Sequence, residues 1–226
     1  MWEHPSMRAP RHRTALVLAA ITCAALLASC GGEDYSAIRN LASPGTTLVC
    51  FGDSLTQGAG AGPGEDFPSL LAAALPIPVV NVGVAGETTA DGLRRLERDV
   101  LSRNPRLVVV FFGGNDFLRR IPREETRRNL EAMVERIQGA GAMVVLVGLK
   151  AGLLTDETGP LYDAVARGRG VLHTPDALAG ILSDPRLKSD AVHPNGAGYR
   201  KLADRLLTEL QPLLKAADRA RGRGGG

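Results

Sequence analysis

The sequence predicts an α/β fold, a three-layer α/β/α sandwich around a central, mostly five-stranded parallel sheet. Short apolar runs alternate along the chain with segments of helical periodicity, which is typical of a parallel sheet with helices on both faces. The chain has 226 residues, of which 44% are hydrophobic. This length and composition favour one domain with a sizeable core, and no internal repeat or second domain boundary is visible.

The strands of this sheet are expected in five apolar runs, the last of them weaker than the others: residues 47–51, 78–82, 107–112, 143–147 and 171–173. Between them, apolar residues at helical spacing predict two helices, and we interpret both stripes as core. The first stripe follows the possible caps Thr88 and Thr89 and consists of Leu93, Leu96 and Val100. The second consists of Leu130, Met133, Val134 and Ile137. A last helix over residues 196–214 should close the domain with Tyr199, Leu202, Leu206 and Leu210.

The N-terminus has the features of a secretory signal. Arg8, Arg11 and Arg13 precede an apolar run over residues 15–27, which is too short for a comfortable membrane span. Removal of residues 1–29 leaves 24 basic and 23 acidic residues, so the formal charge of +3 gives no indication of a nucleic-acid partner.

The end of this segment, Leu27-Ala28-Ser29-Cys30, resembles a bacterial lipobox. The resemblance implies that the Cys30 thiol carries a lipid anchor, which would hold the protein at a membrane in the cell envelope, on the periplasmic side. Gly31 in place of Asp fits outer-membrane sorting if the cell is Gram-negative. The alternative is a plain signal peptide whose cysteine is incidental.

Four segments follow from these observations. Residues 1–29 are expected to be a lipoprotein signal peptide, 30–45 a tether, 46–216 the folded domain and 217–226 a disordered, basic, glycine-rich tail. Cys23 lies in the signal and Cys30 is the candidate anchor, so Cys50 is left alone in the domain without a disulfide partner. We interpret Cys50 as a small core residue of the first strand.

A nucleophile is indicated where the first predicted strand stops. Gly52-Asp53-Ser54 is a sharp turn of small residues, and it places a hydroxyl at a strand end, where α/β proteins keep their chemistry. A serine nucleophile needs a general base, which in turn needs a carboxylate to orient it.

The base is found by elimination among four histidines. His4 and His12 are lost with the signal, and of the other two only His193 has a nearby carboxylate, Asp190, three residues before it. We therefore expect Ser54, His193 and Asp190 to form a catalytic triad. We interpret His173 as structural or pocket-lining, and the alternative role for Asp190 is to cap the last helix.

Four short blocks lie in order along the chain, at predicted strand ends or in a late loop: Gly52-Asp53-Ser54-Leu55-Thr56, Asn81-Val82-Gly83-Val84-Ala85-Gly86-Glu87-Thr88, Gly113-Gly114-Asn115-Asp116 and Asp190-Ala191-Val192-His193-Pro194. Together they resemble the SGNH hydrolases, also called GDSL esterases and lipases. The resemblance is closest to the single-domain thioesterase I, lysophospholipase and arylesterase type, and it implies a flavodoxin-like sandwich. It also implies an oxyanion hole made of the Ser54 N–H, the Gly86 N–H and the Asn115 amide.

The expected function is a serine esterase that hydrolyses carboxylic esters or thioesters of acyl chains through an acyl-enzyme. One alternative is a carbohydrate or peptidoglycan O-acetylesterase. Another is a catalytically silent lipoprotein that binds lipid or glycan. The loop over residues 149–161 could line an acyl pocket with Leu153, Leu154 and Leu161. The partner is then a small-molecule or lipid ester.

No cofactor or metal is implied. Asp53 and Asp116 lack a histidine at ligand spacing, so we interpret both as capping residues or loop ties. The glycines at 58, 60, 62 and 64 do not match a phosphate-binding spacing, because Pro63 stands where the third glycine would be needed. We expect this loop to be a flexible rim beside Ser54. A Gly-x-Ser-x-Gly elbow is excluded by Thr56.

Overall fold

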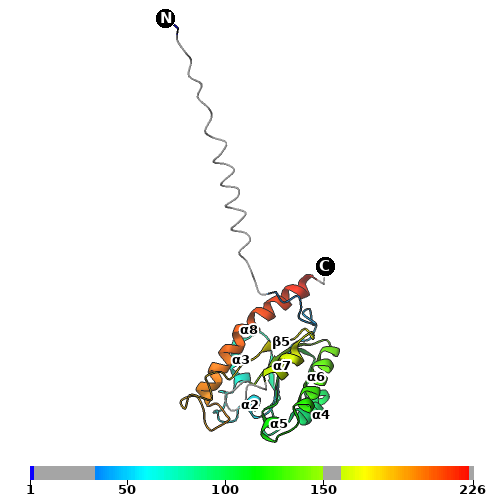
Figure 1. Ribbon diagram of the computed structural model, residues 1–226. Coiled ribbons are helices and arrows are strands. Elements are labelled where there is room, and N and C mark those ends of the chain that lie inside the picture. Colours follow the sequence, from blue (N-terminus) through cyan, green and yellow to red (C-terminus); the bar gives the residue numbers. More distant parts are fainter. Residues whose placement is uncertain (3–33, 150–158, 224–226) are drawn as a thin grey trace. The chain divides into compact units, whose positions relative to one another are not determined.

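Five parallel strands form the central sheet (Figure 1). Their spatial order is β2-β1-β3-β4-β5. The computed structural model describes residues 1–2, 34–149 and 159–223, and a compact unit begins at Tyr35. Its strands are β1 (Thr47–Gly52), β2 (Val79–Asn81), β3 (Pro105–Phe111), β4 (Met143–Val147) and β5 (Leu172–Thr174). Every neighbouring pair is parallel, so the predicted fold class and five-stranded sheet are confirmed.

The three central strands are apolar because helices cover both of their faces. Every residue of β3 and β4 is buried, and in β1 only Thr47 is not. Phe51 and Phe112 pack edge to face with ring centroids 4.8 Å apart. The edge strands β2 and β5 are three residues each, and β2 is shorter than predicted.

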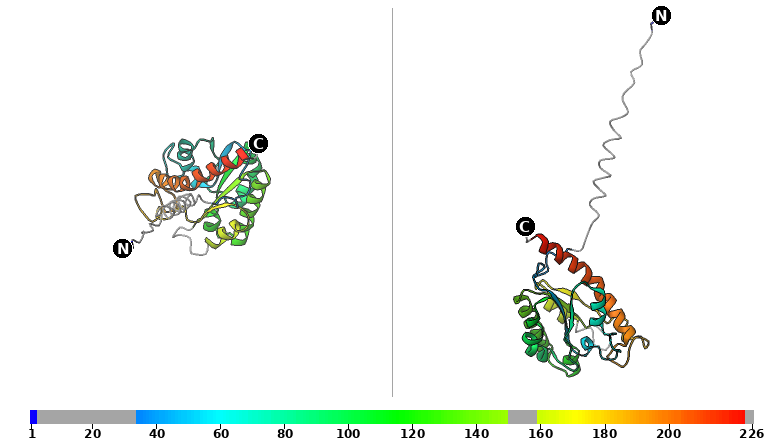
Figure 2. Two further views of the ribbon diagram at one scale, coloured as in Figure 1. Left: turned by 90° about the horizontal axis from the view of Figure 1, so that it is seen from above. Right: turned by 180° about the vertical axis from the view of Figure 1, so that it is seen from behind.

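Two layers of helices enclose the sheet (Figures 1 and 2). Helices α3 and α8 cover one face, and α4, α6 and α7 cover the other. The helices are α2 (Ser54–Gln57), α3 (Phe67–Ala74), α4 (Thr89–Asp99), α5 (Gly114–Leu118), α6 (Arg123–Gly139), α7 (Gly159–Ala166) and α8 (Gly196–Arg223), with a short 3₁₀ turn η1 (Leu101–Arg103).

The two predicted helical stripes pack as core. Helix α4 begins after Thr88, whose side chain forms a capping box with Asp91. Its residue Leu96 is fully buried, as is Val100 at its end, while Leu93 is half-buried. The four apolar residues of the second stripe, in α6, are all fully buried.

Helix α8 continues beyond the predicted end at residue 214 and reaches Arg223. The four residues expected on its inner face are fully buried, as are Leu213 and Ala217 further on. Asp218 then pairs with the buried Arg106, Nη2 to Oδ1 at 2.6 Å. Residues 217–223, expected to be a disordered tail, are therefore helical, because this end of the helix packs against the domain.

The folded unit also begins earlier than predicted. Tyr35 and Ser43 are buried, and the Arg39 N–H donates to Gly170 O at 2.8 Å. The Asn40 amide donates to Gln138 O and Ala142 O at 2.8 and 3.0 Å. The segment from Tyr35, expected to be part of a tether, is thus packed against the start of β4 and β5. Among the described residues, none of the helices combines the length and apolarity needed to span a bilayer.

Candidate active site

Ser54 stands at the carboxyl end of β1, as the first residue of α2. Asp53 caps this helix, and its Oδ1 accepts the Leu55 N–H at 3.0 Å. Gly52 allows the sharp turn, because a Cβ at this position would meet Phe111 O at 2.4 Å. The Ser54 side chain is left half-buried, at the edge of the sheet.

The loop before α8 brings a histidine and a carboxylate to this hydroxyl. His193 Nε2 lies 3.0 Å from Ser54 Oγ, and His193 Nδ1 lies 2.7 Å from Asp190 Oδ2. Asp190 Oδ1 also accepts the N–H groups of Val192 and His193 at 2.8 and 2.9 Å. These hydrogen bonds, first of all the one to the His193 ring, lower the pKa of Asp190 to about 2. The arrangement can remove a proton from Ser54 and stabilise the imidazolium that forms.

The structure also places His173, the other histidine of the domain, and the residue that caps α8. His173, in β5, places its Nδ1 3.2 Å from Asp163 Oδ1, and its burial lowers its pKa. Asn195 provides the side-chain contact at the start of α8, since its Oδ1 accepts the Gly198 N–H at 3.1 Å. His173 is thus paired with Asp163, and Asp190 lies outside the cap of α8.

The two other expected oxyanion donors line the same cavity as Ser54 and His193. Gly86 follows β2 with φ of +80°, a conformation that favours glycine. Arg119 Nη2 donates to its carbonyl at 2.6 Å. Asn115, in the first turn of α5, donates from Nδ2 to Glu87 O at 3.0 Å and to Asp53 Oδ2 at 3.3 Å.

The cavity has a volume of about 280 Å³ and extends from Ser54 over mostly apolar side chains. Its apolar wall consists of Leu55, Ala59, Ala85, Phe117, Leu118, Leu149, Leu178, Leu182 and Val192. Leu161, expected in this pocket, lines a neighbouring cavity instead. Leu153 and Leu154 lie outside the described residues. Most of the wall was not predicted, because it comes from α5 and from loops with no motif.

The glycine-rich loop after α2 contributes to this wall through Ala59. Tyr199 Oη donates to Ala59 O at 2.9 Å, which fixes the loop to α8. Gly60 has φ of +91°, and a Cβ there would meet Pro194 O at 2.5 Å. The loop therefore packs closely against the segment that follows His193.

Asp53 and Asp116 have the structural contacts that were expected of them. Burial raises the pKa of Asp53 to about 7. Asp116 is buried beside Thr89, whose N–H and Oγ1 it accepts at 2.8 and 2.5 Å, and it also accepts from Thr126 Oγ1 at 3.2 Å. Burial also raises the pKa of the Cys50 thiol. Within the described ranges, no three metal-ligating side chains cluster.

A parallel sheet with a serine at the end of the inner strand β1, hydrogen-bonded to a histidine–aspartate pair, defines an α/β serine hydrolase. The profile of the "GDSL-like Lipase/Acylhydrolase family" matches residues 50–201, a range that contains all three side chains. The chain belongs to this family, and it is a serine hydrolase that acts on carboxylic esters.

Its relatives carry esterase and thioesterase names. "Esterase TesA" of Pseudomonas aeruginosa is 31% identical and covers 74% of this chain and 89% of the relative. "Thioesterase 1/protease 1/lysophospholipase L1" of Escherichia coli is 29% identical, with 76% and 87% covered. The solved structure "Crystal Structure of TesA" matches with a TM-score of 0.69 and 30% identity, covering 74% of this chain and 99% of that one. A more distant relative, "Uncharacterized lipoprotein YqeF" of Bacillus subtilis, is 28% identical, with 53% and 51% covered.

Proposed function

We propose that Ser54, His193 and Asp190 hydrolyse acyl esters in two half-reactions. His193 Nε2 takes the Ser54 proton as Oγ attacks the acyl carbon, and then protonates the leaving alcohol or thiol. Water repeats the sequence on the acyl-enzyme, which releases the acid and restores the serine. The hydrogen bond of 3.0 Å between Nε2 and Oγ is the observation that supports this assignment.

The negative charge of each tetrahedral intermediate falls on the former carbonyl oxygen. We assign its stabilisation to the N–H groups of Ser54 and Gly86 and the side-chain amide of Asn115. Donors of this kind stabilise the transition state most when they are held in place before the substrate arrives. The hydrogen bonds of Asn115 and Gly86 to neighbouring segments support this role.

The substrate class that fits the site is an ester of an acyl chain longer than acetyl. The cavity next to Ser54 is lined largely by leucine, alanine and phenylalanine side chains, and Leu178 and Leu182 form part of its wall. Each methylene that it buries is worth about 0.8 kcal/mol, or up to roughly a fourfold gain in kcat/KM. An acetyl group would leave most of this wall without contact.

A chain-length series tests this substrate class. With p-nitrophenyl esters from two to twelve carbons, we expect kcat/KM to rise from acetate to a medium chain and then level off. Leu178→Trp should reduce turnover of the longer esters and spare acetate. Leu161→Trp, in the neighbouring cavity, is the matched control and should leave the profile unchanged. A maximum at acetate, with faster hydrolysis of acetylated glycan, would favour the O-acetylesterase instead.

The catalytic assignment has its own test. Ser54→Ala and His193→Ala should each remove most of the activity, and each should also lose most of the labelling by a fluorophosphonate, because this reagent reacts with activated serines. Asp190→Asn should reduce activity by the same amount or less. Near-normal turnover by purified Ser54→Ala would refute the assignment. An unlabelled, inactive native protein would leave the silent, ligand-binding lipoprotein as the better explanation.

We also propose that Cys30 is lipidated and anchors the enzyme in the cell envelope. The lipobox-like sequence before Cys30 supports this, as does a relative with a lipoprotein name. Incorporation of labelled palmitate, lost in Cys30→Ala, is the expected result. Equal labelling of both proteins would exclude Cys30 as the site.

A further inference from the structure

Arg95 is a buried arginine beside the candidate active site. It lies on α4, and its side chain is only 7% exposed. The guanidinium stacks over the Phe51 ring, 4.7 Å from the centroid, just before the end of β1. Buried arginines are rare and are stable only where every donor finds a partner. The hydrogen-bond partners of Arg95 therefore indicate its role.

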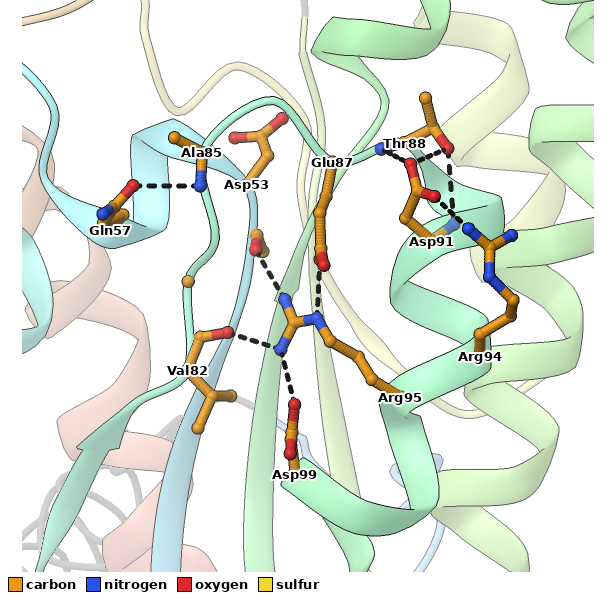
Figure 3. Close-up of polar contacts among 12 residues, drawn as sticks. Asp53, Gln57, Val82, Ala85, Glu87, Thr88, Asp91, Arg94, Arg95 and Asp99 are labelled. Carbon is orange, nitrogen blue, oxygen red and sulfur yellow. Dashed lines mark hydrogen bonds and ion pairs between the residues drawn. The ribbon is translucent and has the colours of Figure 1, made fainter.

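Its donors converge on two carbonyls and two carboxylates (Figure 3). Nη2 donates to Gly52 O at 3.1 Å, and Nη1 donates to Val82 O at 2.8 Å. Nε donates to Glu87 Oε2 at 2.6 Å, and Asp99 Oδ2 lies 3.4 Å from Nη1. In Figure 3 the guanidinium occupies the space between the end of β1 and the loop that follows β2.

Three of these four partners, all except Asp99, adjoin a segment that carries a proposed oxyanion donor. Gly52 lies two residues before Ser54. Val82 and Glu87 flank the loop that contains Gly86, so that the loop is held near both ends. The Glu87 carbonyl accepts the Asn115 amide at 3.0 Å, which links Arg95 through one residue to the third donor.

We propose that Arg95 is the positioning residue of the oxyanion hole, fixing the segments of Ser54, Gly86 and Asn115 relative to one another from beneath. This inference rests on the proposed roles of those three donors. The planar guanidinium suits the task because its donors point in fixed directions, whereas a lysine offers a single ammonium on a flexible stem. A hole fixed before the reaction need not reorganise when charge develops.

The test is a kinetic comparison with two matched arginines. Arg95→Met should lower kcat for a p-nitrophenyl ester by roughly 10- to 100-fold with KM changed less than about twofold, because donor placement matters most in the transition state. Arg94→Met removes the neighbouring arginine, whose side chain is 70% exposed, and should leave kcat unchanged. Arg106→Met removes a buried arginine at the opposite end of the sheet, and should lower Tm but not kcat.

A double-mutant cycle separates positioning from a general loss of stability. If Arg95 acts through the hole, Arg95→Met should cost at least about threefold less in an Asn115→Ala background than in the native enzyme. The same fold-loss in both backgrounds, or a kcat of native size in Arg95→Met, would overturn the proposal. Failure of the proposed triad would show separately, as activity in Ser54→Ala.

Two milder variants apply where Arg95→Met does not fold. Arg95→Lys keeps the charge but loses the fixed geometry, and Glu87→Gln weakens the Nε contact while keeping the carbonyl that holds Asn115. Both should lower kcat by roughly 3- to 10-fold at unchanged KM. Native kcat in both folded variants would count against the positioning role.

Discussion

Asn115 donates to two acceptors in the structure, Glu87 O and Asp53 Oδ2, the second at the longer distance of 3.3 Å. If Asn115 is an oxyanion donor, as we propose, the oxyanion competes with Asp53 for one of these N–H groups. The bond to Glu87 O can persist and keep the amide in place. One side chain thus has both a fixed and an exchangeable hydrogen bond.

Loss of this amide should therefore appear in turnover. Asn115→Ala is expected to reduce kcat by about 10²- to 10³-fold, the usual effect of removing one oxyanion donor. Asn129→Ala is the control, because Asn129 Nδ2 donates to Thr89 Oγ1 at 3.0 Å away from the cavity. It should lower stability and leave kcat within about twofold. Equal effects of both substitutions on kcat would contradict the role of Asn115.

Asp53 makes stability depend on pH. Its pKa is about 7 in the folded protein, raised mainly by burial, against about 3.9 in an unfolded chain. Between these values the folded state holds a proton that the unfolded state has lost. The stabilisation is full below about pH 4 and is lost as pH rises through about 7.

We expect Asp53→Asn to remove this dependence. For the native enzyme, the titration lowers the free energy of unfolding by up to about 2 kcal/mol from pH 5 to pH 7. Urea unfolding at pH 5, 6, 7 and 8 measures it, as the difference between the native protein and Asp53→Asn at each pH. Taking this difference cancels contributions that the two proteins share. A constant difference across the series would show that Asp53 does not titrate there.

The strands of this protein could be predicted because each buried strand is a short apolar run in the sequence. The run at 143–147 matches β4 at both ends, and the run at 47–51 misses β1 by one residue. Strands that are buried on both faces of a parallel sheet are nearly continuous apolar runs. The buried faces of α4 and α6 could be predicted in the same way, from apolar residues at helical spacing.

The ends of the domain could not be predicted in this way. The basic, glycine-rich C-terminus suggested a helix that stops near residue 214, but α8 continues because Asp218 reaches Arg106 in β3. At the other end, Tyr35 gives no periodic signal, yet it is buried. Both outcomes depend on contacts between residues far apart in the sequence.

The same distinction applies to the site. Ser54, Gly86, Asn115 and His193 lie in short motifs, and their family pattern made them visible. Arg95 and the cavity wall depend on how α4, α5 and the loop after β5 pack, so no local pattern marks them. In the sequence, Arg95 is one of three arginines of α4, and only the folded structure shows that it is the buried one.

The end of α8 can be tested by two truncations. Deletion of residues 215–226 removes buried Ala217 and the Asp218 partner of Arg106, whereas deletion of 220–226 keeps both. The longer deletion should cost about 2 kcal/mol or more, which lowers Tm by roughly 4 to 8 °C. The shorter one should leave Tm within about 1 °C. Equal Tm values would mean that this end of the helix does not support the domain.

At the scale of the whole domain, the candidate active site and the start of the folded unit lie at opposite edges of the sheet. Ser54 and Asn115 lie beyond the carboxyl ends of β1 and β3, together with α2 and α5 (Figure 1). The segment from Tyr35 lies at the opposite edge, where Arg39 binds Gly170 before β5. The seven residues of β3 separate the two edges by about 23 Å.

This geometry makes a prediction about substrate access if Cys30 is the lipid anchor. Only residues 31–34 lie between Cys30 and buried Tyr35, so the Cα atoms of these two residues can be at most about 18 Å apart. On this proposal, so short a tether would keep the start of the folded unit near the bilayer, whereas Ser54 lies at the other edge of the sheet. We expect the enzyme to act on esters in the surrounding compartment and not on lipids of its own membrane.

The measurement compares two tethers in dilute proteoliposomes. The native lipoprotein should hydrolyse a soluble p-nitrophenyl ester at its full rate, but a long-chain fluorogenic ester lipid in its own bilayer only slowly. An insertion of about 30 Gly/Ser residues after Gly32 adds roughly 30 Å of mean reach, enough to let the domain turn over. It should raise hydrolysis of the membrane ester at least about tenfold and leave the soluble reaction unchanged, because the insertion changes access and not the site. If the native tether already gives the faster rate on the membrane ester, the cavity reaches its own bilayer and the predicted orientation is wrong.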